Sequence, residues 1–334
     1  MKMKIFSCVA VALYLAATCS AELPGFYSTV NRITWLVADL DHAKQGWIPL
    51  GMSDIQEYPE VLFAGEFHGK PVTIQARQIT GHLGNLTVDM IQPAKGQGNA
   101  FTEFLARHGD GIFSIVHEVA STEAMAGEIK RMESMGVAVL QKVTVKEKNT
   151  SVTLAYFDTA REGKFVLGLV YWPGGAPVTE GRATEGRAMV SHLAPVVRGS
   201  EAVSAFWQRI GFPSMRMEHA TPREDSRYHG QPLWFAFEVG YQHYDQFSYE
   251  WIVPPSTPPN VYIDFLKEHG EGIQHIGIPV DDLPKAAAAY EKLGYRVLQS
   301  GAWGDVGKKD SGQYDYMDTD LIGGVSAELI HAYH

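Results

Sequence analysis

The stretch FLKEHGEGIQHIGIPVDDL, residues 265–283, joins a glycine-rich turn to a short run of apolar residues with a histidine inside it. Apolar side chains alternate from Ile273 to Val280, which is typical of a β-strand. His275 stands where this pattern would accept another apolar residue. A second copy, FLARHGDGIFSIVHEVAST at residues 104–122, has Ser114 at the matching position. The two copies therefore differ at a position where only one of them has an imidazole.

The repeat extends well beyond this stretch. FHGKPV (67–72), DMIQP (89–93) and FLARHGDGI (104–112) each recur 161 residues later, as YHGQPL, EWIVP and FLKEHGEGI. VLQ (139–141) and YFDT (156–159) recur, the latter as YMDT, at offsets of 158 and 160 residues. Ordered anchors at a near-constant offset indicate a duplication. We therefore predict two homologous domains at 26–173 and 188–334, with a linker at 174–187 that is rich in Gly, Pro, Thr and charge.

Each predicted domain contains the same order of elements twice. In the second domain, strand patterns at 188–197, 214–220, 233–240 and 247–254 accompany an amphipathic helix at 200–212. The order strand, helix, strand, strand, strand then repeats from 272 to 332. A β-rich unit of this size has an apolar face that must be covered. We expect an α+β fold in which each domain pairs two βαβββ units into a cup-shaped sheet.

Length and charge narrow the class of partner. The chain has 334 residues, 45% of them hydrophobic, which suits two globular domains. Its formal net charge of −10 argues against binding to nucleic acid or to an anionic membrane surface, because both need basic patches. The composition favours a small-molecule or protein partner.

The N-terminal segment predicts export. Residues 1–21, MKMKIFSCVAVALYLAATCSA, combine two lysines, an apolar run and a small-residue end, as a secretory signal peptide does. The apolar run is too short to span a bilayer. Cleavage after Ala21 would leave a secreted or periplasmic chain that has no membrane segment and lacks both cysteines, Cys8 and Cys19. Disulfides would then be excluded, while lipid attachment at Cys19 stays open.

Four ionisable residues of the second domain lie on predicted strands. The first strands of its two units carry His192 and His275, and the last strands carry Glu250 and Glu328. If the units face each other, these positions converge. Two imidazoles and two carboxylates would be costly to bury unpaired, and a divalent metal would remove that cost.

The βαβββ repeats and the motif GEGIQHIGIPVDDL (270–283) resemble the vicinal oxygen chelate superfamily. That superfamily includes glyoxalase I, methylmalonyl-CoA epimerase, extradiol dioxygenases and 4-hydroxyphenylpyruvate dioxygenase, and the second domain is most similar to the epimerase and glyoxalase I branch. The resemblance implies that one divalent metal, Fe, Mn, Co, Ni or Zn, is held by His192, Glu250, His275 and Glu328. The corresponding residues of the first domain are Thr34, Asp89, Ser114 and Gly168, which implies a degenerate, metal-free copy.

This ligand set favours one reaction class and leaves two alternatives. Four protein ligands leave about two coordination positions for neighbouring oxygens of a small substrate. The resemblance then implies an isomerase, epimerase or lyase with an enolate or enediolate intermediate, and Glu250 or Glu328 as the proton shuttle. An Fe(II) extradiol-type dioxygenase would use only His192, His275 and Glu328. A binding protein without catalysis would need no metal, and a homodimer stays open for any of these.

Overall fold

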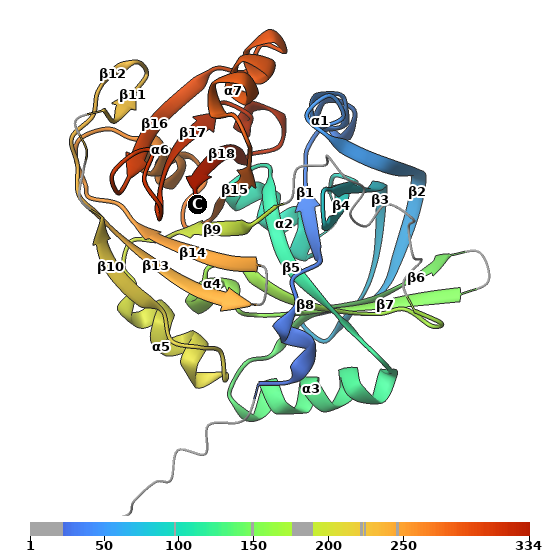
Figure 1. Ribbon diagram of the computed structural model, residues 1–334. Coiled ribbons are helices and arrows are strands. Elements are labelled where there is room, and N and C mark those ends of the chain that lie inside the picture. The colour runs from blue at the N-terminus through green and yellow to red at the C-terminus, as the bar shows by residue number, and fades with distance from the viewer. Residues whose placement is uncertain are drawn as a thin grey trace, which may run out of the picture.

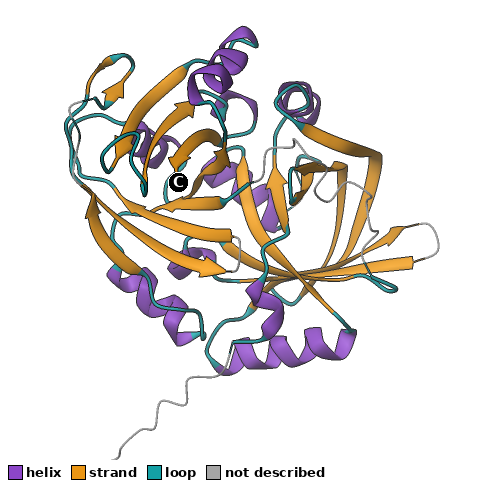
Figure 2. Ribbon diagram, viewed as in Figure 1, coloured by secondary structure: helices purple, strands orange, loops and turns teal. Residues whose placement is uncertain are grey.

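The computed structural model describes residues 23–96, 98–147, 150–175, 190–220, 223, 225–244 and 247–334. The predicted signal peptide at 1–21, with Cys8 and Cys19, and residues 176–187 of the predicted linker lie outside these ranges. No helix in the described ranges is long and apolar enough to span a membrane. Two curled sheets lie side by side (Figure 1), and α3, α5 and α7 cover their outer faces (Figure 2). The predicted α+β class with two tandem domains is confirmed.

We call the part of the chain that forms the first sheet the first domain, and the part that forms the second sheet the second domain. The first sheet is a closed barrel of eight strands in the order β1-β4-β3-β2-β6-β7-β8-β5. Its elements are η1 (Gly25–Ser28), β1 (Arg32–Leu36), α1 (Leu40–Trp47), β2 (Met52–Phe67), β3 (Lys70–Leu83), β4 (Leu86–Pro93), α2 (Ala100–His108), β5 (Gly111–Val119), α3 (Thr122–Ser134), β6 (Val139–Glu147), β7 (Thr150–Phe157), α4 (Ala160–Gly163) and β8 (Val166–Tyr171).

In the described residues, the second sheet has ten strands and does not close. Its order is β10-β13-β14-β9-β15-β18-β17-β16-β11-β12. Its elements are β9 (His192–Val196), α5 (Glu201–Arg209), β10 (Arg216–Ala220), β11 (Arg227–Tyr228), β12 (Gln231–Pro232), β13 (Phe237–Tyr244), β14 (Phe247–Val253), α6 (Val261–Glu268), β15 (Gly272–Pro279), α7 (Leu283–Lys292), β16 (Val297–Trp303), β17 (Ser311–Met317), η2 (Asp320–Ile322) and β18 (Ser326–Tyr333).

One strand prediction of the second domain is wrong in position. The alternation at 233–240 predicts a strand from Leu233, but β13 begins at Phe237. Leu233 and Phe235 are buried in a local apolar cluster, and the Leu233 N–H donates to the carbonyl of Ser226, the residue just before β11 and not one of β14. Burial in a folded-back segment therefore produced the alternation that resembles a strand.

Equivalent asparagines cap the N-termini of α2 in the first domain and α6 in the second. The Asn99 side chain accepts backbone N–H bonds at the start of α2, and Asn260 does the same for α6. Asparagine is a favoured N-cap because its carbonyl oxygen satisfies N–H groups that have no partner in the helix. Ala100 and Val261 directly follow these two asparagines. Their backbone N–H groups donate hydrogen bonds to the side chains of Gln141 and Gln299. Each helix is thus tied to its sheet in the same way.

The domains meet through paired contacts that follow the duplication. His108 Nδ1 lies 2.6 Å from the His269 carbonyl oxygen, and His269 Nδ1 lies 2.6 Å from the His108 carbonyl oxygen. Trp47 Nε1 donates to the Ile322 carbonyl and Trp207 Nε1 donates to the Gly163 carbonyl, each across the interface. His108 and His269, which occupy equivalent turns of the two copies, therefore join the domains.

Candidate metal centre

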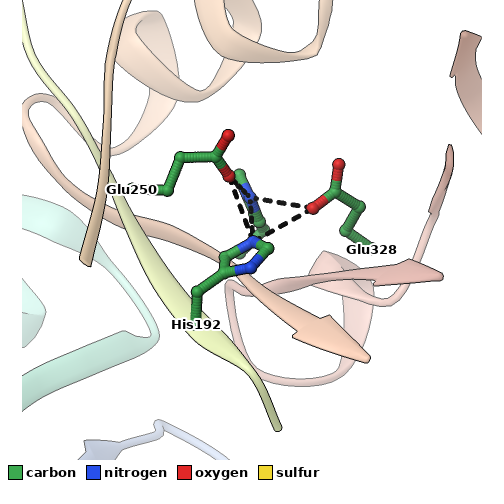
Figure 3. A group of neighbouring side chains, drawn as sticks. His192, Glu250 and Glu328 are labelled. Atoms are coloured by element: carbon green, nitrogen blue, oxygen red, sulfur yellow. Dashed lines mark hydrogen bonds and ion pairs between the residues drawn. The ribbon is translucent and has the colours of Figure 1, made fainter. Parts of the chain in front are cut away.

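The four predicted ligands come together on four neighbouring strands. His192 lies on β9, Glu250 on β14, His275 on β15 and Glu328 on β18. Their ligand atoms all lie within 4.8 Å of one another, and no other such cluster of three or more residues occurs in the described ranges. Figure 3 shows His192, Glu250 and Glu328 pointing toward one another from separate strands.

The closest atoms are the Nε2 atoms of the two imidazoles and one oxygen of each carboxylate. His192 Nε2 lies 3.1 Å from Glu250 Oε2, 3.1 Å from Glu328 Oε2 and 3.2 Å from His275 Nε2. His275 Nε2 lies 3.4 Å from the same oxygen of each glutamate. Four potential ligand atoms therefore surround one small volume.

Strand register and one glycine produce this convergence. Gly277 of β15 pairs with His192 on one side and with Glu328 on the other, so these positions form a row across the sheet. A Cβ atom at Gly277 would lie only 2.1–2.5 Å from the His192 ring atoms. Gly277 thus makes the space that the imidazole occupies. Sequence reasoning missed this residue, although a glycine inside a strand is a known sign of such close approach.

Hydrogen bonds orient the two imidazoles. His275 Nδ1 lies 2.6 Å from Gln274 Oε1, and the Gln274 amide nitrogen donates to Ser326 Oγ. Because Gln274 Oε1 can only accept, His275 Nδ1 must be the donor, which leaves the Nε2 lone pair directed at the cluster. His192 Nδ1 lies 3.3 Å from Ser191 Oγ. Outer hydrogen bonds of this kind hold metal-ligating histidines in their binding tautomer.

The cluster is buried and strongly coupled electrostatically. His275 is fully buried, and Glu328 and His192 are 5% and 9% exposed. Burial alone would lower the pKa of His192, but the negative charges of the neighbouring Glu250 and Glu328 carboxylates raise this pKa to about 10. Burial alone would raise the pKa values of both glutamates, but the histidines lower them. Both carboxylates are thus held in the anionic form that binds metal.

The geometry fits a divalent metal. Metal bonds of about 2.0–2.2 Å to imidazole and carboxylate place adjacent ligands roughly 3 Å apart. The contacts of His192 Nε2 have this spacing, and Glu328 Oε2 is buried without a hydrogen bond. One cation would give Glu328 Oε2 a partner and would separate the Nε2 atoms of His192 and His275, which otherwise face each other. The predicted ligand set could therefore hold a metal ion. Divalent Fe, Mn, Co, Ni and Zn are all bound by imidazole and carboxylate ligands.

A tyrosine that the sequence did not single out contacts this cluster. Tyr241 on β13 donates its hydroxyl to Glu250 Oε1 at 2.8 Å. Burial, with the charge of Glu250, raises the pKa of Tyr241, so the phenol stays protonated. The strand pairing of Tyr241 with Glu250 places the two side chains next to each other.

The strand register corrects one correspondence in the first domain. His192 pairs with Ser248 on one side and with Gly277 on the other. The equivalent residues of the first domain, Thr87 and Val116, both pair with Arg32. Arg32, and not Thr34, therefore corresponds to His192. The sequence interpretation was wrong by two residues, because Thr34 precedes His192 by 158 residues whereas the residue matched by strand pairing, Arg32, precedes it by 160.

The first domain has a different cation at the equivalent place. Arg32 Nη1 lies 2.5 Å from Asp89 Oδ2, and both side chains are largely buried. Gly168 matches Glu328, and a Cβ there would lie 2.7 Å from Ser114 Oγ. A side chain at Gly168 would have to displace Ser114, and the described part of the first domain has an ion pair where the second has a candidate metal centre.

Comparisons with known proteins agree with this fold. Residues 191–311 match the family described as the Glyoxalase/Bleomycin resistance protein/Dioxygenase superfamily. No curated protein sequence matches the chain. A mutant of 4-hydroxymandelate synthase from Streptomyces coelicolor has a similar structure, with a TM-score of 0.60 and 18% identity over 91% of this chain and 92% of that one.

Two further solved structures are more distant. A Mn(II)-bound glyoxalase from Novosphingobium aromaticivorans has a TM-score of 0.48 and 13% identity, over 92% of this chain and 83% of that one. A catechol 2,3-dioxygenase has a TM-score of 0.44 and 13% identity, over 91% and 88%. Residues 191–311 thus match the family model, and the likeness to the 4-hydroxymandelate synthase structure shows that the whole chain shares its fold.

Proposed function

We propose that the protein is a metal-dependent enzyme that acts on a small oxygenated substrate and transfers a proton next to a carbonyl group. The observation that carries this proposal is the convergence of four potential ligands, two imidazoles and two carboxylates, on one small volume. When bound, a divalent metal supplies Lewis-acid stabilisation of negative charge on the substrate oxygens. An isomerase, epimerase or lyase would use this chemistry.

His192, His275, Glu250 and Glu328 would hold the metal, and Glu250 is the better candidate for moving the proton. Its side chain is 13% exposed, whereas that of Glu328 is 7% exposed. Glu250 Oε1 also contacts the hydroxyl of Tyr241, which is 39% exposed. A proton taken from the substrate at the Glu250 carboxylate would thus have a short route to solvent. Glu328 has no such neighbour and would serve only as a ligand.

Metal analysis of the purified protein tests the proposal. We expect about one divalent ion per chain, and none in His275→Ala, because removal of a buried ligand breaks the set. His219→Ala is the matched control, since His219 is an exposed histidine of the same domain. His269→Ala is less suitable because His269 joins the domains. Equal metal content in wild type and His275→Ala would refute the site.

The same preparation separates the two alternatives. Redox-active iron with substrate-dependent O₂ uptake would favour the extradiol-type dioxygenase, which needs only His192, His275 and Glu328. Against that reaction, Glu250 lies as close to His192 Nε2 as Glu328 does, which favours four ligands over three. Ligand binding by protein without metal would favour the non-catalytic binding protein.

We also propose that the chain is exported, from the signal-like composition of residues 1–21. The full-length gene should yield a mature protein that begins near Glu22. N-terminal sequencing of material from the cell exterior or periplasm tests this, and an intact Met1 in the purified protein would contradict it.

A further inference from the structure

Tyr241 lies at the open side of the candidate metal centre. Its neighbours on β13, Gly240 and Gln242, are buried on the opposite face of the strand, while Tyr241 itself is 39% exposed. Its hydroxyl nevertheless makes a specific contact, a hydrogen bond of 2.8 Å to Glu250 Oε1. The second oxygen, Glu250 Oε2, is the one that faces His192 and His275. The two carboxylate oxygens thus have separate partners.

The first domain has the same arrangement with different residues. Thr80 matches Tyr241 in register, since it pairs with Asp89 as Tyr241 pairs with Glu250. Thr80 Oγ1 donates to Asp89 Oδ1 at 2.8 Å, and Asp89 Oδ2 accepts from the Arg32 guanidinium. In both domains, therefore, a hydroxyl from the adjacent strand holds one carboxylate oxygen while the other faces a cation or the cluster that would hold one.

We propose that Tyr241 is a positioning residue for the metal ligand Glu250, a role that rests on the proposed metal binding. Glutamate has three rotatable side-chain bonds, and its two oxygens are chemically equivalent when free. The hydrogen bond to Oε1 fixes the carboxylate so that Oε2 is presented to the ion. Residues that hold a ligand in this way typically contribute about 10–100-fold to metal affinity.

The test compares metal affinity in two tyrosine variants of the full chain. Tyr241→Phe removes only the hydroxyl, and we expect binding of Mn(II) or Co(II), measured by competition with a chelator, to weaken about tenfold. Tyr244→Phe is the control, because Tyr244 is on the same strand, is buried, and its hydroxyl has no hydrogen-bond partner among the described residues. We expect its metal affinity to equal that of wild type.

A spectroscopic measurement distinguishes positioning from a general effect on folding. The visible absorption of the Co(II)-loaded protein should change in Tyr241→Phe, because the carboxylate binds in a different geometry, while the melting temperature of the metal-free protein stays the same. Wild-type affinity and an unchanged Co(II) spectrum in Tyr241→Phe would overturn the inference. Absence of metal binding by the wild type would instead remove the proposed function.

Discussion

The two domains share one topology but differ in how the sheet closes. In the first domain the hairpin of β2 and β3 is continuous, and β2 pairs with β6 from Phe63 to Phe67. Among the described residues of the second domain, the equivalent hairpin consists of β10 paired with β13 and β11 paired with β12, and only Arg227 and Tyr228 of β11 pair with β16. The pairing at the tip persists in both, since Phe67 pairs with Gln141 and Tyr228 with Gln299. In the described residues, one side of the second sheet is therefore open.

The side chains inside the two sheets differ accordingly. An apolar cluster that includes Phe63, Phe101 and Phe113 packs inside the closed barrel. In the second domain a smaller apolar cluster leaves the four potential ligands on the sheet interior. A filled barrel is stabilised by burial of apolar surface, whereas a site needs polar groups and access. The first domain is thus built around an apolar interior, whereas four ionisable side chains occupy the interior of the second.

The largest effect is expected when the second domain receives the arginine that the first domain has at the equivalent position. His192→Arg would place a guanidinium beside Glu250, as Arg32 lies beside Asp89. We expect the metal content to fall from about one ion per chain to near zero, because one ligand is lost and a fixed positive charge repels the ion. Elemental analysis of the purified variant measures this.

His192→Ala is the control for this exchange. It removes the ligand without supplying a charge, so it should also lose the metal but should unfold at a lower temperature than His192→Arg, in which both carboxylates keep a partner. Full metal content in His192→Arg would show that the two positions are not functionally equivalent.

The next largest effect is expected in the first domain. Arg32→Met would leave the Asp89 carboxylate buried without its guanidinium, which typically costs about 3–5 kcal/mol of stability. Metal content should not change. Denaturant unfolding measures the loss, and Arg107→Met is the control, because the ion pair of Arg107 with Glu103 is exposed and should contribute less than about 1 kcal/mol. A loss no greater than that of the control would show that the ion pair is dispensable.

The sequence predicted the composition of the candidate site because the duplication exposed it. His275 aligns with Ser114 in the repeat, and the strand patterns place all four potential ligands on strands that the structure brings together. Periodicity identifies which residues lie on strands and on which face. The resemblance to a superfamily then supplied the reason why these four belong together.

Features that depend on pairing between strands could not be predicted. The match of Arg32 to His192 follows from register, and a shift of two residues along one strand leaves the faces of its side chains unchanged. The space at Gly277 depends on a side chain of the neighbouring strand. The role of Tyr241 likewise needs the pairing of β13 with β14. Local sequence contains none of these long-range contacts.

A pH dependence separates the two domains at another matched position. His117 on β5 is buried, with Nδ1 near the Thr29 carbonyl and no hydrogen-bond partner for Nε2 among the residues that the structure describes, whereas the matching residue of β15 is Ile278. Burial lowers the pKa of His117 from its ordinary value of 6.5 to about 4. The unfolded chain therefore binds this proton first as the pH falls, and stability should decrease from about pH 6.5 toward pH 4.

His117→Ile gives the first domain the residue of the second and should remove this contribution. Between pH 7 and pH 5 the variant should lose roughly 2 kcal/mol less stability than the wild type, from the linkage of the two pKa values. Urea unfolding at both pH values measures the difference. Parallel losses in the two proteins would mean that His117 keeps an ordinary pKa in the folded state.

The smallest effect tests whether Gly277 makes room for a ligand. In Gly277→Ala the new methyl group would meet the His192 ring at 2.1–2.5 Å, so the imidazole must move. Metal ligands tolerate such displacement poorly, and we expect about tenfold weaker metal binding by chelator competition. The first domain has Val116 at this position, where no imidazole needs the space.

Gly272→Ala is the control on the same strand, because a Cβ there would meet only the Lys164 carbonyl at 3.7 Å. If both variants bind metal as the wild type does, the strand can shift to accommodate the methyl group, and register, rather than the absence of a side chain, positions His192.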